Sequence, residues 1–506
     1  MINKIDYMLD RITMYRLLIY VLSGLVGIAA ILAYFKLLHF SPLSLLLSTA
    51  FLLIMCWAMN TVFSYIFTVP TNIESASITA LILALIVNPA SSPTTFQFLG
   101  WAAILAMASK YILAINKKHL FNPAAIAVVI TSFVLGESAS WWIGTASMLP
   151  FVLLGGLLIT HKLRQKDMVL SFCLAAIITI CLVSLVQGNS ILTAVEQSLL
   201  QSPLFFLAFV MLTEPLTAPP TRKLRRYYAI LTGVLFFPQL HIGPLYSAPE
   251  LALVVGNIFS YAVSPKQKVL LTLRRKIKAA PDIVDFVFKP SQKLAFMPGQ
   301  YMEFTLAHPR TDSRGNRRYF TLASSPTEND VHLGIRFYEK SSSFKKALYR
   351  INGGTKFVGA QVAGDFTLPS DTEQKLVFIA GGIGITPFRS MLKYMLDTQQ
   401  RRDIILFYIN KCTDDIVYKD ILSAAQTKLG LRTFFTLTDT TAIPRNWPGL
   451  VGRISEQMIL HTVPDYAERT YYLSGPPDMV KANEQVLRYM GVRSDQIKKD
   501  FFPGLV

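Results

Sequence analysis

The distribution of charged residues divides this 506-residue chain into two parts with different chemistry. Residues 1–263, about half of the chain, contain only 14 of its 49 Lys and Arg residues and 8 of its 31 Asp and Glu residues. Charged residues make up 16% of the whole chain, compared with about 25% in an ordinary soluble protein. The first part is therefore predicted to lie in lipid and the second part to be soluble.

The first part is predicted to contain ten membrane spans, because a helix needs about 20 mostly apolar residues to cross a bilayer. No cleaved signal peptide is predicted, since the first apolar run lacks a small-residue cleavage site. The predicted spans are residues 17–35, 43–67, 73–89, 97–116, 123–136, 146–160, 168–187, 198–213, 227–238 and 248–263.

Basic residues give these spans an orientation. With the N-terminus in the cytoplasm, 12 of the 14 basic residues of the first part fall on the inner side, as the positive-inside rule requires. An even number of spans then returns the chain to the cytoplasm before Pro265. The predicted location is the inner (plasma) membrane, with many spans and with both termini cytoplasmic.

Ten spans form two sets of five, so an internal duplication is predicted to be an inverted repeat. Folds of that kind place their sites on short or proline-interrupted segments. Three such segments contain Glu74, Asn122 and Glu214. A simpler interpretation, which the residues alone favour, is that Asn-Pro and Glu-Pro begin or end helices at the membrane surface.

Three strings in the first part resemble the NqrB/RnfD family of membrane electron-transport subunits: Ser75–Leu85, Leu120–Ala124 and Thr213–Pro219. This resemblance implies a flavin held within an inverted-repeat helical bundle, through which electrons cross the membrane. The family's Ser-Gly-Ala-Thr string for covalent FMN is absent. The nearest loop offers Thr145, and a non-covalent FMN or riboflavin is the alternative. Asn122 and Thr145 are the candidate cofactor residues of this half.

The second part has two patterns. Short alternating runs over residues 267–368, separated by Gly and Pro, predict a small antiparallel barrel. From Lys375 onward, apolar strands alternate with helical stretches, which predicts a parallel nucleotide-binding sheet. The predicted fold is a polytopic helical membrane bundle (1–264), followed by a β-barrel domain (265–370) and an α/β domain (371–506).

Residues 318–326 in the barrel resemble the Arg-x-Tyr-Ser/Thr signature of the ferredoxin–NADP reductase superfamily. The resemblance implies FAD bound against the barrel. Arginine suits a diphosphate because its planar fork donates two parallel hydrogen bonds. Phe320, where the family more often has Tyr, is expected to stack on the isoalloxazine, and Thr321 to bond flavin N5. The candidate FAD residues are Arg318, Tyr319, Phe320, Thr321, Ser324, Ser342 and Ser343.

A glycine-rich turn follows the first predicted strand of the α/β domain and leads into a helix, which is the setting of a phosphate-binding turn. Thr386 is predicted as the helix N-cap and Pro387 as the first helical residue. The helix N-terminus then faces a dinucleotide diphosphate with its free amides. The candidate residues are Gly381, Gly382, Gly384, Thr386 and Pro387.

A third motif, Ser474-Gly475-Pro476-Pro477, ends the last predicted strand. The superfamily usually has Cys-Gly-Pro-Pro here, with the Cys near the nicotinamide, so Ser474 is expected at that place. Phe502 is a candidate gate over the flavin. Thr321, Ser474 and Phe502 are thus the candidate catalytic residues. Acidic Asp414 and Asp415 favour NADH over NADPH, while Lys411 argues for the 2′-phosphate.

The predicted function is a membrane-bound NAD(P)H-dependent flavin oxidoreductase. It passes electrons from cytoplasmic NAD(P)H through FAD, and a membrane flavin, to an extracytoplasmic flavoprotein or a quinone. No metal site is predicted, and no nucleic-acid partner, because membrane topology accounts for the basic loops. Two alternatives are a ferric-reductase or NADPH-oxidase-like haem reductase, which needs paired histidines within helices, and a redox-sensing transporter.

Overall fold

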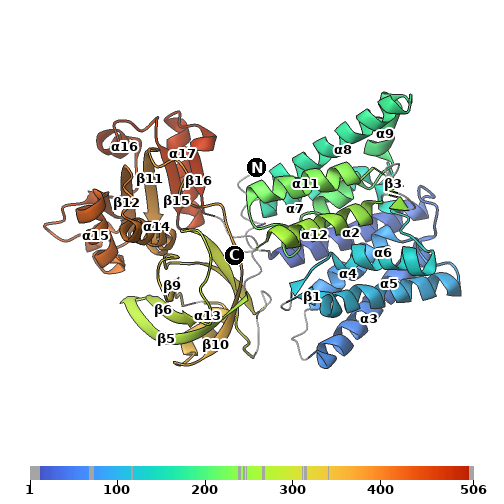
Figure 1. The fold of residues 1–506 in the computed structure, drawn as a ribbon, viewed down its shortest axis with the longest axis horizontal. Helices are drawn as coiled ribbons and strands as arrows, with labels where there is room; N and C mark the ends of the chain where they lie inside the picture. The colour runs from blue at the N-terminus through green and yellow to red at the C-terminus, as the bar shows by residue number, and fades with distance from the viewer. Residues whose placement is uncertain are drawn as a thin grey trace. The chain divides into compact units, whose positions relative to one another are not determined.

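The structure of the protein is a computed structural model. It divides into two compact units, and the boundary along the sequence lies between Ser264 and Pro265. Each unit is described by itself, with the elements labelled in Figure 1. The structure describes residues 9, 12–67, 73–115, 118–237, 241–242, 245–246, 248–264, 268–309, 312, 316–339 and 341–500.

The first unit is helical. Side-chain hydroxyls or amides cap many of its helices, for example Ser41, Asn122 and Thr221, and proline stands in the first turn of several. Two short antiparallel hairpins, β1–β2 (Ala114–Ile115 and Lys118–His119) and β3–β4 (His241–Ile242 and Leu245–Tyr246), join helices. The helices are α2 (Met14–Tyr34), α3 (Pro42–Ile66), α4 (Ile73–Ile86), α5 (Pro93–Ile112), α6 (Pro123–Leu135), α7 (Leu149–Leu163), α8 (Lys166–Val186), α9 (Ile191–Leu200), α10 (Leu204–Phe206) with its π-helical continuation η2 (Leu207–Met211), α11 (Arg222–Leu235) and α12 (Pro249–Val263).

Each predicted span overlaps one of these helices, or the bent α9–η2 pair in the case of residues 198–213. By length and apolar composition, only α2, α3 and α8 of the described helices are able to cross a membrane, and the α9–η2 pair, bent by 57°, makes a fourth if it counts as one span. Ten spans therefore remain a prediction.

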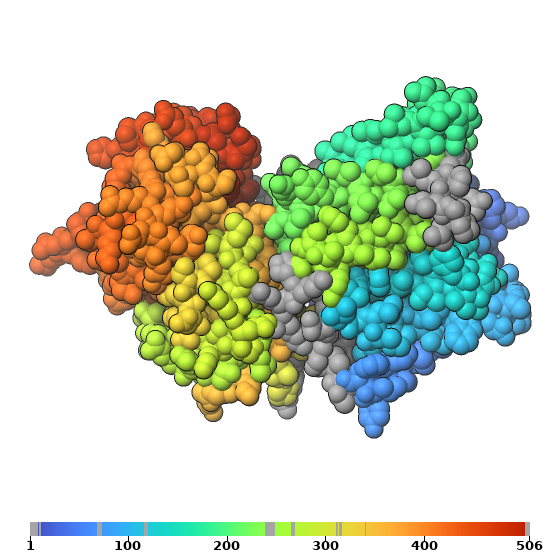
Figure 2. Space-filling model, viewed as in Figure 1, coloured from blue at the N-terminus to red at the C-terminus, as the bar shows by residue number. Residues whose placement is uncertain are grey.

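Large exposed hydrophobic side chains are frequent on this unit, among them Tyr34, Ile54 and Leu182. In Figures 1 and 2, α9 lies at the edge of the unit, and none of its residues is buried.

Three helix pairings recur within two sets of five elements. In the first set, α3 packs on α5, α5 on α6 and α2 on α4; in the second set, α8 packs on α11, α11 on α12 and α7 on α10–η2. The sets meet through α2 with α7 and α6 with α12. Glycine permits some of these approaches, since a Cβ at Gly156 would overlap the ring of Phe209 and one at Gly233 would crowd the carbonyl oxygen of Phe172. These three pairings correspond between the two sets, whereas α3 packs extensively on α4 and its counterpart α8 only slightly on η2.

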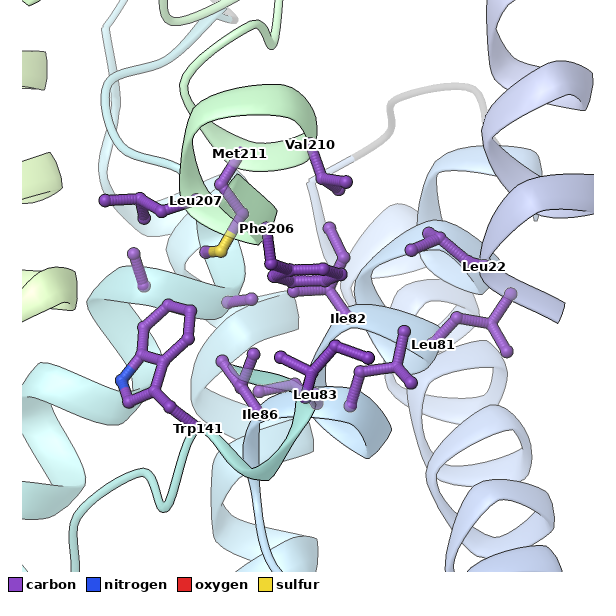
Figure 3. Packing of buried hydrophobic residues seen from close by; sticks show 14 of the residues in the cluster. Leu22, Leu81, Ile82, Leu83, Ile86, Trp141, Phe206, Leu207, Val210 and Met211 are labelled. Carbon is purple, nitrogen blue, oxygen red and sulfur yellow. The ribbon is translucent and has the colours of Figure 1, made fainter. Parts of the chain in front are cut away.

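The core of this unit (Figure 3) is formed by the third element of each set, which is α4 in the first set and η2 in the second. All residues of α4 from Ala76 to Ile86 are buried, as are all residues of η2. Leu83 and Ile86 of α4 lie near Phe206 of α10 in that view. A helix that is apolar all round is normally buried in this way. The carbonyl groups at the end of α4 are bonded by the loop after α6, where the amide of Trp141 donates to Ile86 (2.8 Å) and the indole of Trp142 to Val87 (3.0 Å).

The second unit begins with a six-stranded antiparallel sheet, which confirms the predicted antiparallel fold of this region. Strand order is β8-β7-β10-β5-β6-β9, and one apolar core fills the inner face. The elements are β5 (Lys268–Ala280), β6 (Ile283–Pro290), β7 (Tyr301–Thr305), β8 (Arg317–Thr321), β9 (Val331–Arg336), α13 (Ser343–Arg350) and β10 (Lys356–Ala363).

A six-stranded parallel sheet follows, as the alternation of strands and helices predicts. Strand order is β14-β13-β12-β11-β15-β16, and separate apolar clusters cover its two faces. The elements are β11 (Leu376–Gly381), the 3₁₀ turn η3 (Gly382–Ile385), α14 (Thr386–Thr398), β12 (Ile404–Asn410), α15 (Lys419–Leu429), β13 (Arg432–Leu437), β14 (Leu450–Val451), α16 (Glu456–Thr462), β15 (Thr470–Ser474), α17 (Pro477–Tyr489) and β16 (Ile497–Lys499).

Candidate functional site

Strand β8 presents Arg318 and Phe320 on one face. In the antiparallel register Arg318 lies opposite Phe304 and Phe320 opposite Met302, and both partners belong to the core of the sheet. The Arg318 side chain is only 7% exposed, and its guanidinium lies 5.5 Å from the ring centroid of Phe344. The ring of Phe320 lies 5.9 Å from that of Phe344. The motif thus places a cation and an aromatic ring beside the start of α13.

The N-terminus of α13 completes an anion-binding arrangement. Ser342 is the N-cap, and the backbone amide of Ser343 donates to Oδ2 of Asp312 (3.0 Å). The other oxygen of this carboxylate accepts a hydrogen bond from Nη2 of Arg318 (3.0 Å). The Ser343 hydroxyl accepts from the amide of Asp312 (2.9 Å). Helix amides and a guanidinium that hold a carboxylate are also the donors that hold a phosphate, so these residues fit the diphosphate of FAD.

Asp312 is the residue that sequence reasoning missed. Its carboxylate occupies the position that the resemblance assigns to the diphosphate, between Arg318 and Ser343. Nothing in the local sequence marks it, because a lone Asp in a loop between two strands is usually a solvated turn residue. Only the fold brings it to the helix terminus.

Tyr319 and Thr321 face the other side of β8, because side chains alternate along a strand. The Tyr319 hydroxyl donates to Oε1 of Gln361 (3.1 Å), and Thr321 is buried opposite Tyr301. Ser324, just beyond the strand, is also buried; its carbonyl accepts from the Ser390 hydroxyl of α14 (2.6 Å), while its own hydroxyl has no hydrogen-bond partner among the described residues. The seven candidate FAD residues therefore divide into a cradle (Arg318, Phe320, Ser342, Ser343) and a group that faces elsewhere (Tyr319, Thr321, Ser324).

The glycine-rich turn connects β11 to α14 at the carboxyl edge of the parallel sheet. A Cβ at Gly381 would overlap the Met479 sulfur, and a Cβ at Gly384 would overlap the backbone of Ser474. These glycines therefore let two strand-to-helix turns approach each other, and Gly382 has φ +52°, which favours glycine. The chain thus joins the second and third sequence motifs at one place.

One detail of the turn prediction is wrong. The N-cap of α14 is Ile385, not Thr386, and Thr386 has helical backbone angles. Its hydroxyl donates to the carbonyl of Ile383 (3.1 Å) and so does not cap an amide. The cause is the 3₁₀ turn over Gly382–Ile385, which starts the helical path one turn early. Pro387 still lies in the first turn, where its missing N–H costs nothing.

Ser474 ends β15 and is buried, and its hydroxyl donates to Oδ2 of Asp500 (3.0 Å). Asp500 is fixed in turn, since its amide donates to the carbonyl of Leu473 (2.9 Å). Gly475 and Pro476 follow, and Pro477 is the first residue of α17. Phe502 lies outside the described residues. The candidate catalytic hydroxyl therefore has a carboxylate neighbour, whose position only the pairing of β15 with β16 reveals.

Two arginines join the antiparallel sheet to the region of the parallel sheet. Arg389 of α14 donates to the carbonyl of Ala323 (2.9 Å) and to Oε1 of Glu328 (3.0 Å). Arg336 of β9 donates to Asp282 (2.6 Å) and to Asp415 (3.0 Å). Burial lowers the pKa of Arg336, but the two carboxylates outweigh this effect and hold the pKa above its ordinary value. The end of the flavin motif and the helix after the glycine turn are therefore in direct contact.

In the helical unit, Asn122 caps α6 and its amide nitrogen donates to Oε2 of Glu214 (3.0 Å). Its backbone amide donates to Oδ1 of Asn257 (2.8 Å). Two of the three proline-interrupted segments thus meet at one polar cluster. Thr145 lies in the loop that follows α6, and its buried hydroxyl has no hydrogen-bond partner among the described residues.

Comparison with known proteins bears on the second unit. Residues 378–485 match the family model of the oxidoreductase NAD-binding domain. A flavohemoprotein of Oceanobacillus iheyensis is 23% identical over 240 residues, which are 46% of this chain and 58% of that protein. The glycine betaine monooxygenase reductase subunit of Chromohalobacter salexigens is 25% identical over 227 residues, or 44% of this chain and 60% of that protein. The chain thus spans about three fifths of these two relatives.

A third relative, the xylene/toluene monooxygenase electron transfer component XylA of Pseudomonas putida, is 24% identical over 262 residues, or 50% of this chain and 70% of that protein. The flavohemoglobin structure from Malassezia yamatoensis covers 91% of this chain and 98% of its own at 16% identity, but its TM-score of 0.43 is too low to establish a shared fold. For the second unit, the predicted class, an NAD(P)H-dependent flavoprotein oxidoreductase, is confirmed, as are FAD and NAD(P)H as the cofactors of that unit. The second unit resembles a ferredoxin reductase-like module.

Proposed function

We propose that this chain takes electrons from cytoplasmic NAD(P)H through FAD, passes them into its helical unit and delivers them across the inner membrane to an extracytoplasmic flavoprotein or a quinone. Matches for the reductase half are to reductase and electron-transfer components of larger systems. The proposal adds to that role a helical unit in the same chain, which has three or four helices able to span a membrane.

The observation that carries the reductase part is the cradle of Arg318 and the α13 amides. It holds an anion already, in the form of the Asp312 carboxylate. The arginine fork and the Ser343 amide are proposed to bind the FAD diphosphate, and Phe320 to stack on the flavin from the same face of β8. Thr321, on the other face, is proposed to reach flavin N5 through its backbone amide.

The chemistry that FAD supplies when bound is the conversion of a two-electron donor into single-electron transfer. The residues of the chain are proposed to bind and orient the two nucleotides. The amides of the turn Gly381–Ile385 and the N-terminus of α14 hold the dinucleotide diphosphate. Ser474, at the end of the neighbouring strand, positions the nicotinamide with the help of Asp500. Phe502 is proposed to cover the flavin until the nicotinamide arrives.

Three observations support the electron path through the helical unit. Three helix pairings correspond between its two sets of five elements, in keeping with the proposed ten-span inverted repeat. The core lies where the third elements meet (Figure 3), and Asn122 and Glu214 meet at a polar cluster. A non-covalent FMN or riboflavin near Asn122 is proposed as the carrier. Thr145 is the candidate for covalent attachment, although its buried hydroxyl lies in a closely packed loop.

A pair of arginine variants tests the flavin cradle. Arg318→Ala in the full-length detergent-solubilised chain is expected to lower bound FAD at least tenfold, because it removes the buried charge-assisted bonds. Its neighbour Arg317 is exposed and forms a longer ion pair with Glu303 (3.5 Å), so Arg317→Ala is the matched control and is expected to keep FAD. Extracted flavin per chain is the readout. Equal FAD in both variants would contradict the assignment of Arg318.

A spectrum and a sidedness assay test the path across the membrane. Flavin bands alone, with more than one flavin per chain, are expected, whereas a Soret band would select the haem-reductase alternative. In vesicles that expose the second unit, added NADH is expected to reduce an impermeant oxidant trapped inside together with candidate carriers. NADH oxidation without any reduction of the trapped oxidant would refute the transmembrane path and leave the proposed reductase activity standing.

Flavin fluorescence on a denaturing gel that persists in Thr145→Ala would remove Thr145 as an attachment site.

A further inference from the structure

A basic cluster lies where two neighbouring helices of the first unit, α8 and α11, begin. Asp167, in the first turn of α8, forms ion pairs with Nε of Arg222 (3.0 Å) and with Nη2 of Arg226 (3.2 Å) of α11. Lys166 and Lys223, next to these residues in the sequence, are both exposed. The cluster formed by these five residues therefore contains four basic side chains and one acidic side chain.

The two helices run side by side from this cluster in the same direction (Figure 1). Asp167 pairs with Arg226 near the start of both helices. About two turns further along, a Cβ at Gly233 of α11 would lie 2.6 Å from the carbonyl oxygen of Phe172 and 2.9 Å from the Cβ of Ala175 of α8. Residue numbers thus rise together along the contact, so the helices are parallel, and the glycine lets their backbones approach closely.

Exposed apolar side chains continue from the cluster along both helices. On α8 they follow Lys166 at intervals of four residues, and on α11 they follow Arg226 in the same way, so each set shares a face with its basic residue. Between 40% and 60% of each residue is exposed, for Leu170, Leu174 and Ile178 of α8 and for Ile230 and Val234 of α11. Tyr227, at the border of the basic and apolar parts, is 50% exposed, and aromatic side chains are enriched at that level of a membrane.

This arrangement goes beyond what membrane topology requires. The positive-inside rule asks only for a surplus of lysine and arginine in the inner loops. Here the ion pairs with Asp167 hold two arginines together at the head of two apolar stripes. A charged head above apolar stripes has the same order as a lipid phosphate above its acyl chains, and basic surfaces between helices on the cytoplasmic side bind anionic lipid headgroups.

We propose that the α8–α11 surface, which is the basic cluster with the two apolar stripes, binds an anionic phospholipid of the cytoplasmic leaflet. The headgroup phosphate binds the arginines and lysines of the cluster, and the acyl chains lie along the stripes. The inference rests on the membrane location in the proposed function, but not on the proposed electron path. A zwitterionic lipid binds less tightly, because its ammonium group is repelled by the same cluster.

A pair of double variants tests the headgroup contact in the full-length, detergent-solubilised chain. Lys166→Gln with Lys223→Gln removes two exposed charges and keeps the ion pairs with Asp167. The Kd for phosphatidylglycerol, from native mass spectrometry, is expected to rise about thirtyfold, since each lysine near an anionic lipid contributes a factor of about five. Lys419→Gln with Lys428→Gln removes the same charge from exposed positions on α15 and is expected to keep the wild-type Kd. Equal values in the two double variants would overturn the inference.

The acyl-chain contact has a test of its own. Ile230→Ser removes apolar area from the α11 stripe and is expected to weaken phosphatidylglycerol binding severalfold. Glycerophosphoglycerol, which is the same headgroup without acyl chains, is expected not to displace the lipid at equal concentration. Displacement by this headgroup, together with an unchanged Kd in Ile230→Ser, would assign the cluster to a soluble anion and overturn the lipid assignment.

The mass spectra also distinguish other occupants of this surface. Wild-type chain is expected to bind phosphatidylglycerol at least tenfold more tightly than phosphatidylethanolamine, and equal affinities would contradict the proposal. A dimer that excludes the lipid in the wild type and is lost in the Lys166/Lys223 variant would assign the surface to a second copy instead. A chain that binds phosphatidylglycerol here but carries no electrons across the membrane would refute the proposed electron path and leave this inference standing.

Discussion

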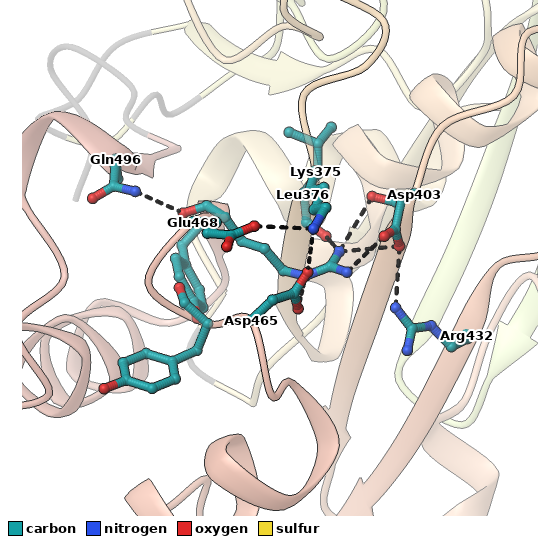
Figure 4. A network of polar contacts seen from close by, with 10 residues as sticks. Lys375, Leu376, Asp403, Arg432, Asp465, Glu468 and Gln496 are labelled. Atoms are coloured by element: carbon teal, nitrogen blue, oxygen red, sulfur yellow. Dashed lines mark hydrogen bonds and ion pairs between the residues drawn. The ribbon is translucent and has the colours of Figure 1, made fainter.

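The two edges of the parallel sheet differ in the groups that they carry. At the amino edge, Arg469 has a side chain only 2% exposed, yet its guanidinium donates to Asp403 (2.7 Å) and Asp465 (2.6 Å). Lys375 adds ion pairs to Asp465 and Glu468 (Figure 4). At the carboxyl edge, Gly381 and Gly384 carry no side chains, and two strand-to-helix turns lie in close contact there. An edge of paired charges holds strands together, whereas a glycine-rich turn before a helix leaves backbone amides for an anionic ligand.

The largest expected effect comes from breaking the amino edge. Arg469→Leu leaves two carboxylates without their buried partner and is expected to lower the free energy of unfolding of the second unit by about 3–5 kcal/mol. Arg432 also pairs with Asp403 (3.1 Å) but is half exposed, so Arg432→Ala is the control, with an expected loss below about 1 kcal/mol. Denaturant unfolding followed by fluorescence measures both. Similar losses in the two variants would show that burial of Arg469 is unimportant.

The next effect breaks the carboxyl edge by adding one carbon atom. Gly384→Ala places a Cβ against the backbone of Ser474, so the two turns must separate; we expect a loss of about 1–3 kcal/mol in stability and of most NADH binding. Gly353→Ala is the control, because a Cβ there meets only the Arg274 carbonyl oxygen at 3.9 Å. NADH titration and thermal unfolding are the readouts. Full NADH affinity in Gly384→Ala would show that the turns have room to move.

A smaller effect is expected from the Ser474 hydroxyl. Ser474→Ala removes the hydrogen bond to Asp500 and is expected to slow flavin reduction by NADH about tenfold, since positioning and one hydrogen bond are lost. The affinity for ADP-ribose is expected to stay the same, because Ser474 lies at the nicotinamide end. Stopped-flow flavin absorbance gives the rate. A rate equal to that of the wild type would remove Ser474 from the candidate catalytic residues.

The smallest effect concerns pH at the amino edge. The hydrogen bond from Arg469, together with one from Lys375, lowers the pKa of Asp465 from 3.8 to about 2, although burial acts in the opposite direction. A lowered folded-state pKa gives stability that is present above about pH 4 and is lost as the pH falls toward 2. The thermal midpoint is therefore expected to fall over that window, and less so in Asp465→Asn. A midpoint with the same acid dependence in both chains would contradict this assignment.

The sequence predicted most of the second unit because its strands are short apolar runs with clear punctuation. The alternation of strands and helices from Lys375 onward was predicted, and the glycine turn was placed correctly between a strand, β11, and a helix, α14. The N-cap was wrong by one residue, since a 3₁₀ turn over Gly382–Ile385 is set by packing against Ser474. Local patterns do not encode such tertiary contacts.

Residues that act through long-range contacts were harder to predict. Asp312 and Asp500 reach Arg318 and Ser474 only through strand pairing and loop closure. In the helical unit, apolar runs predicted where helices lie, but runs such as α4 are too short for their length alone to indicate a span. The proline-interrupted segments of Asn122 and Glu214 were predicted as candidates, and their contact came from the fold.

The Asp312 carboxylate has a consequence for the folding of the antiparallel sheet. It pairs with the buried guanidinium of Arg318, so the cost of taking that positive charge out of water is offset from within the chain. The polypeptide thus carries its own counter-ion for this arginine.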